Sequence, residues 1–309
     1  MEVAPETPQR APALVRREAA LVSPLRYPGG KRRFVGYVAE TLRLNDLRPR
    51  LYVEPFAGGA SVALHLLATG QVERVLLGER DPLVAAFWRV LFSDTDWLCD
   101  QVAACRPSLE EWVRLRAEAG QTEREKAWAC LYLNRTSFSG ILSGTAGPIG
   151  GRAQASAYDI GCRFPAATLM RRIRAVARFA EHVRVVEGDY RNTLAVASAS
   201  GVPARDRFVY LDPPFYRKAE RLYRHHFAEA DHRALRDALA ALDAPYLLSY
   251  DAAPEVRALY TDTRTHGVEL LYSATRRGDL VRADEIVLTN LPTLPTSTRL
   301  WRTSAEWRA

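Results

Sequence analysis

Cysteine is scarce in this chain, and its spacing does not suit a metal site. The 309 residues include four cysteines, none in a CxxC pair and none within a paired histidine pattern. Isolated thiols are typical of proteins from reducing compartments, whereas small secreted domains depend on disulfide frameworks. We therefore expect neither a bound metal nor a disulfide framework.

Long apolar runs are also missing. No segment approaches the length that crosses a bilayer, and the N-terminal residues contain no apolar signal core. These absences predict a cytoplasmic protein with no membrane partner. The hydrophobic fraction of 48% and the charged fraction of 26% are those of an ordinary globular protein.

Lysine is rare as well: Lys31, Lys126 and Lys218 account for 3 of the 43 basic side chains, and arginine supplies the rest. The net charge of +7 favours a polyanionic partner, although charge spread over a whole chain does not locate one. Lysine carries a compact charge on a flexible stem, whereas arginine is a planar fork. A lysine directly after the Pro-Gly-Gly turn at 28–30 therefore suggests a tight site, the alternative being an ordinary surface loop.

What is present predicts an α/β fold. Short apolar runs bounded by turn residues indicate strands, and periodic segments indicate helices at 61–69 and 82–92. The expected strands lie at 51–53, 75–77, 183–186, 208–211, 246–249, 268–272 and 285–289. Between about 93 and 179 the chain is mostly helical but interrupted: residues 123–132 are periodic, and residues 134–151 are dense in glycine, serine, threonine and proline, as in a loop. Residues 1–20, expected to be mobile, and 292–309 lack periodicity and are interpreted as tails.

The tetrapeptide Asp212-Pro213-Pro214-Phe215 follows the apolar run 208–211. Open α/β sheets bind ligands at the carboxyl ends of their strands, which is where this tetrapeptide falls. Two successive prolines cannot continue a strand ladder or enter a helix interior, so they form a stiff loop. Its carboxylate and carbonyls could accept both hydrogens of a planar amino group while a ring stacks on the phenylalanine. A simple strand-ending turn is the alternative.

Residues 53–61 (VEPFAGGAS) follow the first strand and open a helix. Glycines here let the backbone approach a ligand, and the helix N-terminus adds a partial positive charge. The alternative is a tight strand-to-helix turn, for which two adjacent glycines suffice. The spacing is not GxGxxG, so a dinucleotide site is not supported. An acidic group about twenty residues after a glycine turn suits a ribose diol. Glu79 is the first choice for it and Asp81 the competitor, a solvated acidic turn being the alternative.

Together these segments resemble the D12 class of DNA N6-adenine methyltransferases, the Dam-type enzymes. The resemblance covers about residues 25 to 290 and rests on six motifs in the family's order: 27–31, 53–61, 78–81, 132–140, 187–190 and 210–215. It implies a Rossmann-like methyltransferase sheet with helices on both faces, formed by the discontinuous catalytic domain 21–92 and 180–291. The insertion 93–179 would recognise the target. The implied methyl donor is S-adenosylmethionine (AdoMet), and the implied substrate is duplex DNA.

The resemblance also assigns roles to single residues. The loop 212–215 would bind the target amine and carry the catalysis. Glu79 would take the ribose hydroxyls of AdoMet, and Asp189 would face its adenine. The other residues expected beside AdoMet are Tyr27, Gly30, Lys31, Glu54, Phe56, Gly58 and Gly59. The chain departs from the family at Phe215, where tyrosine is commoner, at Glu79, where aspartate is usual, and in the compact segment after Gly140.

The chemistry of the loop supports this interpretation. An adenine amino group is a poor nucleophile because its lone pair is delocalised into the ring. The Asp212 carboxylate and the Pro213 carbonyl would hold both N–H bonds and favour a pyramidal nitrogen aligned for attack on the methyl group. The base must first be flipped out of the duplex, and Phe215 offers a face on which it could stack.

Basic residues near aromatic ones are the candidate DNA contacts. The stretch 216–224 suits phosphate contact and a stacked strand, or is a solvated basic loop. The segment 134–151 could enter a groove. The expected DNA-binding residues are Asn134, Arg135, Arg152, Arg217, Lys218 and Arg221. Arginines 171, 172, 174 and 178 could equally be the solvated face of a helix, and the histidines 225, 226 and 232 are expected to be surface residues without metal.

Two rival functions keep the same fold. One is an RNA adenine-N6 methyltransferase with the same catalytic loop, and the other is a catalytically silent nucleic-acid-binding protein. A nicotinamide dehydrogenase is disfavoured by the glycine spacing. We expect a monomer, with a cognate restriction endonuclease as a candidate partner.

Overall fold

The computed structural model describes residues 21–26, 31–217, 224–261, 263–272, 281–296 and 299–300. In this part of the chain, seven strands form one sheet in the order β3-β2-β1-β4-β5-β7-β6. The first five in that order are parallel, and β7 runs antiparallel to both β5 and β6. The strands are β1 Leu51–Glu54, β2 Arg74–Glu79, β3 Val183–Glu187, β4 Arg207–Leu211, β5 Tyr246–Asp251, β6 Thr265–Tyr272 and β7 Val281–Thr289. The predicted α/β class and each predicted strand are confirmed.

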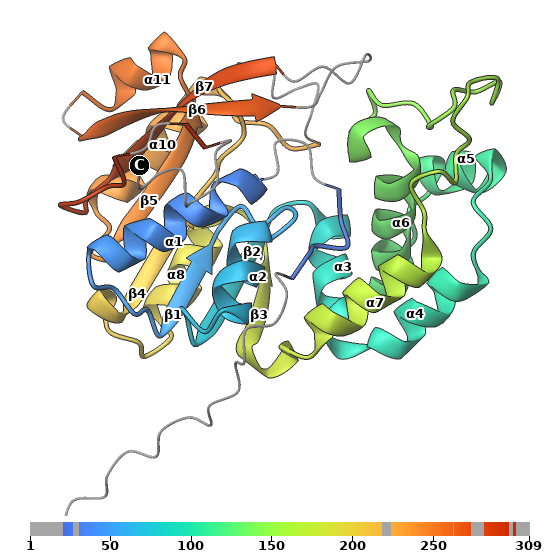
Figure 1. Cartoon of the computed structure of the whole chain (residues 1–309), viewed down its shortest axis with the longest axis horizontal. Helices are drawn as coiled ribbons and strands as arrows, with labels where there is room; N and C mark the ends of the chain where they lie inside the picture. The colour runs from blue at the N-terminus through green and yellow to red at the C-terminus, as the bar shows by residue number, and fades with distance from the viewer. Residues whose placement is uncertain are drawn as a thin grey trace, which may run out of the picture.

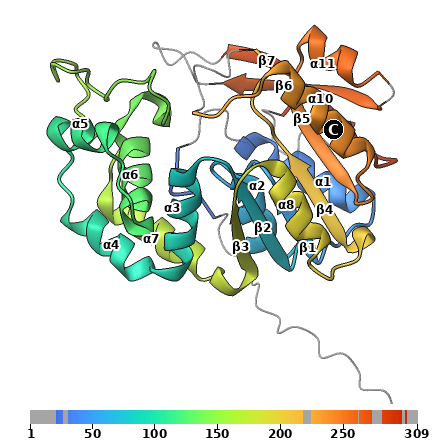
Figure 2. The ribbon, with the colours of Figure 1, turned by 180° about the vertical axis from the view of Figure 1, so that it is seen from behind.

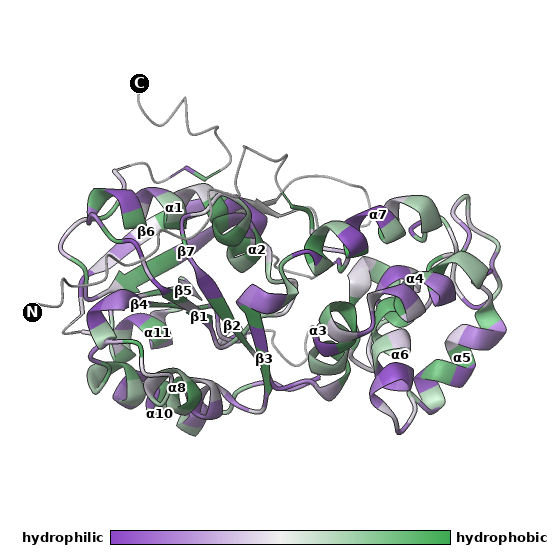
Figure 3. Ribbon diagram, turned by 90° about the horizontal axis from the view of Figure 1, so that it is seen from below, coloured by the Kyte–Doolittle hydropathy of each residue, from purple (hydrophilic) through white to green (hydrophobic). Residues whose placement is uncertain are grey.

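The sheet is buried on both faces. Tyr52 points into one apolar cluster, while its neighbours Leu51 and Val53 point into another. The first cluster includes residues of α1 (Val35–Leu44), α2 (Ser61–Ala68) and α3 (Pro82–Ser93), and the second includes residues of α8 (Tyr190–Ser198), α10 (Glu229–Ala240) and α11 (Pro254–Leu259). Figures 1 and 2 show these layers from opposite sides, and Figure 3 shows the apolar strands between them. Burial of both faces explains why the strands are continuous apolar runs in the sequence.

Four further helices form a lobe beside the sheet (Figure 1): α4 Thr95–Ala104, α5 Leu109–Ala117, α6 Glu123–Thr136 and α7 Ala166–Ala177. Local sequence determines where these helices begin. The Ser108 hydroxyl accepts a hydrogen bond from the first turn of α5, and Thr122 with Glu125 forms a capping box at the start of α6. Helix α3 packs along α6 and thereby joins the lobe to the sheet.

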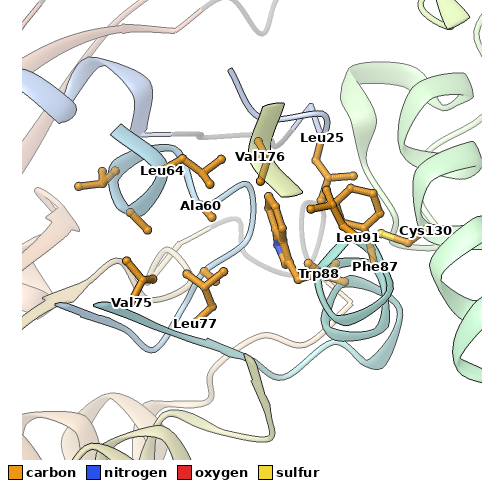
Figure 4. Packing of buried hydrophobic residues seen from close by; sticks show 14 of the residues in the cluster. Leu25, Ala60, Leu64, Val75, Leu77, Phe87, Trp88, Leu91, Cys130 and Val176 are labelled. Carbon is orange, nitrogen blue, oxygen red and sulfur yellow. The ribbon is translucent and has the colours of Figure 1, made fainter. Parts of the chain in front are cut away.

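The junction between lobe and sheet is filled by apolar side chains. Figure 4 shows Trp88 of α3 with Ala60 and Leu77 on its sheet side, Leu25 on the opposite side and Val176 above the indole. Trp88 is fully buried, as is Val176 of α7. The N-terminal segment that carries Leu25 is therefore held against both parts of the molecule.

One predicted boundary is wrong. Helix α6 continues to Thr136, so the first residues of the segment expected as a loop from position 134 are helical. In the segment after position 292, which was expected as a tail, Leu294 and Leu300 are buried and the Leu300 N–H donates to the Glu269 carbonyl at 3.0 Å. The expected N-terminal tail at 1–20 lies outside the described residues.

Candidate active site

The glycine turn and the Asp-Pro-Pro-Phe loop meet at one edge of the sheet. β1 and β4 are parallel neighbours, and both end at this edge. The strand order reverses direction at β1, and such switch points leave a crevice for ligands. A cavity lies there, lined by the backbone and side chains of residues 54–61 together with Lys31, Glu79, Arg80, Asp81, Asp212, Pro214, Arg224, His225 and Phe227. Of the predicted cofactor residues, the structure brings together Lys31, Glu54, Phe56, Gly58, Gly59 and Glu79.

The glycine turn is fixed by contacts with two elements, β2 and α3. Gly58 has a φ of 46°, a left-handed conformation that favours glycine. The Ala57 N–H donates to the Gly78 carbonyl at 2.9 Å, and the indole Nε1 of Trp88 donates to the Gly58 carbonyl at 2.9 Å. Because these carbonyls are committed to the protein, the conformation of the turn does not depend on a ligand.

The buried carboxylate of Glu79 accepts hydrogen bonds from the backbone and also lines the cavity. Its two oxygens accept hydrogen bonds from the backbone N–H groups of Gly58 at 3.0 Å and Asp81 at 2.9 Å. Burial raises the pKa of Glu79 to about 7. Asp81, the competing choice, caps α3 by accepting from the Leu83 N–H at 2.9 Å. Glu79 therefore ties the glycine turn to β2 and still lines the cavity.

Glu54 is a second buried acid of the cavity. One of its oxygens accepts from the Tyr52 hydroxyl at 3.0 Å and from the Ala63 N–H at 3.1 Å. The latter group belongs to the first turn of α2, where backbone donors have no helical partner. Burial raises the pKa of Glu54 to about 8. This side chain is therefore protonated over part of the neutral pH range and fixes the start of α2.

Asp212 lies in an ion-pair network with a lysine and a second acid. Its Oδ1 is 3.1 Å from the Lys31 Nζ and accepts a hydrogen bond from the Ser249 hydroxyl at 3.0 Å. The same ammonium donates to both carboxylate oxygens of Glu285, at 2.7 and 2.6 Å. Burial raises the pKa of Asp212 to about 6, a rise that Lys31 opposes and Glu285 reinforces. The Asp212 side chain remains 23% exposed, whereas Lys31 and Glu285 are buried.

The rest of the proline loop is anchored on β5. The Tyr216 N–H donates to the Asp251 carboxylate at 2.8 Å, and the Lys31 ammonium lies 5.9 Å from the centre of the Phe215 ring. The Tyr216 ring packs on His232 at 4.5 Å between centroids. The expectation of a surface histidine at position 232 is wrong, because this ring is buried and contacts the Tyr250 hydroxyl. Burial lowers its pKa to about 4, which keeps the ring neutral.

Asp189 does not line the cavity. Its carboxylate caps α8, accepting from the backbone N–H groups of Arg191 and Asn192, and it pairs with the Arg191 guanidinium at 2.7 Å. Phe56 packs between Tyr190 and Phe227, each at 5.8 Å between ring centroids. The predicted contact of Asp189 with a cofactor stays a prediction. Tyr27 and Gly30 lie outside the described residues.

The candidate DNA-binding residues are scattered. Asn134 is fully buried, and its amide is bonded to the Arg26 backbone and the Gly140 carbonyl, so it has no N–H left to offer DNA. Arg217 is exposed and pairs with Glu255 at 2.6 Å, while Arg152 is exposed in the loop after α6. Arg135 is buried. Lys218 and Arg221 lie outside the described residues.

Several residues of the site were not predicted, among them Glu285 and Phe227. Glu285 stands at the start of the apolar run 286–288, and an acid inside a buried strand is the signal that could have identified it. Phe227 carries no comparable signal in the sequence. In the part of the chain that the structure describes, no group of three or more His, Cys, Asp or Glu side chains could hold a metal. No helix among these residues is long and apolar enough to span a bilayer.

Comparison with known proteins gives one family. The family model of the D12 class N6 adenine-specific DNA methyltransferases matches residues 27–274. The type II methyltransferase M.MjaIII of Methanocaldococcus jannaschii is 20% identical over 207 residues, which cover 62% of this chain and 68% of that protein.

Solved structures with related folds are more distant. A proposed RNA methyltransferase from Pyrococcus horikoshii has a TM-score of 0.38 and 14% identity, with 86% of this chain and 84% of that chain covered. A precorrin-6y C5,15-methyltransferase from Geobacter metallireducens has a TM-score of 0.36 and 11% identity, with 84% and 87% covered.

Proposed function

Because the chain belongs to the family of D12 class N6 adenine-specific DNA methyltransferases, we propose that the cavity between its glycine turn and its Asp-Pro-Pro-Phe loop is where the methyl group is transferred. The protein is a DNA adenine-N6 methyltransferase, and the family implies AdoMet as the methyl donor.

The residues of the cavity fit AdoMet. The carboxyl groups of Glu54, Glu79 and Asp212 line it and suit a ligand that carries hydroxyl groups, and the ionised Asp212 also suits its positive charge. The rings of Phe56 and Phe227 line the same cavity and offer apolar faces for a purine. When bound, AdoMet supplies a methyl group activated by a positively charged sulfur. Glu79, Phe56 and the glycine turn would hold it, with Tyr27, Gly30 and Asp189 as further candidates.

Asp212 would bind the target amine. Its carboxylate and the Pro213 carbonyl would accept the two N–H bonds of a flipped adenine, while the ring of Phe215 would stack on the base. This role requires an ionised Asp212. The Lys31 ammonium at 3.1 Å favours the ionised form and keeps the pKa of Asp212, about 6, below neutrality despite its burial.

Lys31 would act on the aspartate rather than on the cofactor alone. Its ammonium lies between two acids, so it offsets the negative charge that would otherwise accumulate at the edge of the sheet. Acids that share a site without such a cation raise one another's pKa. The Asp212–Lys31–Glu285 arrangement is the observation that carries the proposal, because it gives the carboxyl group of the loop a defined charge state.

The test is the acceptor of methyl groups from labelled AdoMet. Duplex DNA should take the label at adenine N6, and structured RNA should take none. Label in RNA but not in DNA would favour the rival RNA methyltransferase. AdoMet binding without transfer to either acceptor would favour a catalytically silent protein.

Partners beyond DNA are further proposals. We infer that the protein acts as a monomer in the cytoplasm and that a cognate restriction endonuclease accompanies it. Light scattering on the purified protein tests the first point. The second is tested by whether DNA methylated by this protein resists a nuclease that cleaves the same motif.

A further inference from the structure

Arg135 of α6 is a buried cation that pairs with no acid among the described residues. The residue is 5% exposed, and its Nε has no hydrogen-bond partner. Arg26 is similar, since its Nη1 is buried and unpartnered. Buried charges in proteins are normally paired or hydrogen-bonded, because removing a charge from water is costly. Packing alone does not explain why two arginines each have a buried, unpaired donor.

The two arginines line one cavity with two more. It has a volume of about 350 Å³ and lies behind the glycine turn, between the N-terminal segment and helices α1, α2, α6 and α7. Its charged lining residues are Arg26, Arg32, Arg135 and Arg172, with His65 beside them, and no acid is among its described lining residues. A volume of this size holds a tetrahedral anion and several waters, since each water occupies about 30 Å³.

The arginines repel one another. The pKa of Arg135 is lowered to about 10 by burial and by Arg26, Arg172 and Arg163. Burial also lowers the pKa of Arg26 and of Arg172, and neighbouring arginines add to both shifts. A purely structural cluster would gain nothing from gathering like charges in one cavity. An anion in the cavity would pair with all of them.

We propose that this arginine cavity binds a phosphate group of the DNA backbone. This inference rests on the proposed function, which supplies DNA as the partner. Four guanidinium groups offer many donors and no acceptor, which matches phosphate oxygens better than a base edge, where donors and acceptors are mixed. The cavity therefore positions the duplex rather than reading its sequence.

The arginine cavity touches the active site through a shared wall. Gly59 and Ser61 line both cavities. A phosphate held by Arg135 and Arg172 would therefore lie against the same turn that frames the proposed AdoMet site. The binding of the duplex and the conformation of the AdoMet site would then both depend on the backbone at residues 59–61.

Binding to duplex DNA at several salt concentrations tests the proposal. The variant Arg172→Ala should weaken binding to all sequences alike, by about tenfold to a hundredfold. The slope of the logarithm of the binding constant against the logarithm of the salt concentration should become shallower by up to about the value of one phosphate contact. The matched control is Arg171→Ala, which removes the same charge from an exposed position next along α7 that does not line the cavity. Equal losses in the two variants would overturn the proposal, since charge alone would then suffice.

The thermal stability of Arg135→Met gives a second readout. Removing an unpaired buried charge should raise the melting temperature while DNA binding weakens, a combination that a structural role for Arg135 would not produce. Inorganic phosphate should stabilise the wild type more than this variant. The proposal would be contradicted if Arg135→Met were less stable than the wild type and if phosphate raised the melting temperature of neither protein.

The outcomes separate the possible ligands. A changed methylation motif in Arg172→Ala would mean base reading, and phosphate stabilisation without any DNA effect would mean a site for a free anion. Either result overturns the assignment of the cavity to a phosphate of the DNA backbone. Direct binding needs no methyl transfer, so a protein that binds through this cavity but methylates no DNA would refute the proposed function and leave this inference standing.

Discussion

At the scale of single residues, the central feature is the charge state of Asp212. Its carboxylate is partly exposed to the cavity and shares the Lys31 ammonium with Glu285. Burial raises the pKa of Asp212 to about 6, while the two neighbours act on it with opposite signs. The pH dependence of methyl transfer should therefore report on both neighbours.

Lys31→Met and Glu285→Gln should shift the acid limb of the pH–rate profile in opposite directions. Loss of Lys31 removes a cation, so the pKa of Asp212 rises and activity is lost at higher pH than in the wild type. Loss of the Glu285 charge removes a repelling anion, so the limb moves to lower pH. Single-turnover rates between pH 5 and pH 9 would measure this. Shifts of the same sign would mean that Asp212 is not the titrating group.

Glu54 should make the protein less stable as the pH rises. Its folded pKa of about 8 lies above the ordinary value of 4.5, so between those values the unfolded chain is ionised while the folded chain holds a proton. Stability falls across that window. Glu54→Gln keeps an acceptor for Tyr52 and Ala63 without the titration, and should stabilise the protein at pH 8 by about 2 to 4 kcal/mol. Melting curves at pH 5 and pH 8 check this, since a gain of equal size at both values would argue against it.

At the scale of elements, the conformation of the glycine turn depends on strand β2 and on helix α3, which follows it. The Trp88 indole of α3 reaches back to the Gly58 carbonyl, and Glu79 at the end of β2 binds the Gly58 N–H. The turn was predicted from its glycines and from its place after a strand. Its supports were not, because they come from residues 21 and 30 positions away.

Trp88→Phe should loosen this turn. The change keeps an aromatic ring in the core but leaves the buried Gly58 carbonyl without its donor, which costs about 1 to 3 kcal/mol. AdoMet affinity should fall together with thermal stability. The matched control is Trp97→Phe in α4, whose ring packs on Arg124 and lies outside the cavity lining. Calorimetric titration with AdoMet would measure the effect, and unchanged affinity in Trp88→Phe would refute it.

The helices of the lobe show where local sequence information ends. The capping box at Thr122 and Glu125 marks the start of α6 in the sequence. The end of α6 was misplaced because Asn134 is a common loop residue, whereas here its amide bonds to the backbone of Arg26, 108 positions earlier in the chain. A residue whose partner is that distant gives no local sign of its role.

At the scale of the whole molecule, the sequence predicted the sheet and the two loops of the site, since each depends on a short motif next to a strand. It did not predict the pairs that join distant segments. Lys31 and Glu285 are 254 positions apart, and the arginines of the second cavity come from four separate segments. Only the folded chain shows that these charges converge.

If separate parts of the molecule read the DNA bases and bind the phosphates, two arginine variants should have different effects. Arg152, exposed in the loop after α6, should influence which DNA motif is methylated, at about 1 to 3 kcal/mol for a base contact. Arg217, beside the catalytic loop, should affect binding to all sequences alike. Methylation of a randomised duplex library by Arg152→Ala and Arg217→Ala separates them. The reverse pattern would mean that the two regions have exchanged roles.

The most direct test of the account is N6-methyladenine in the DNA of a host that expresses the chain. Long-read sequencing should find the modification at one motif with the wild type and nowhere with Asp212→Ala. The purified variant should still bind AdoMet, because Asp212 is assigned to the target amine. Methylation by Asp212→Ala within a few fold of the wild type, or none by the wild type, would contradict the account.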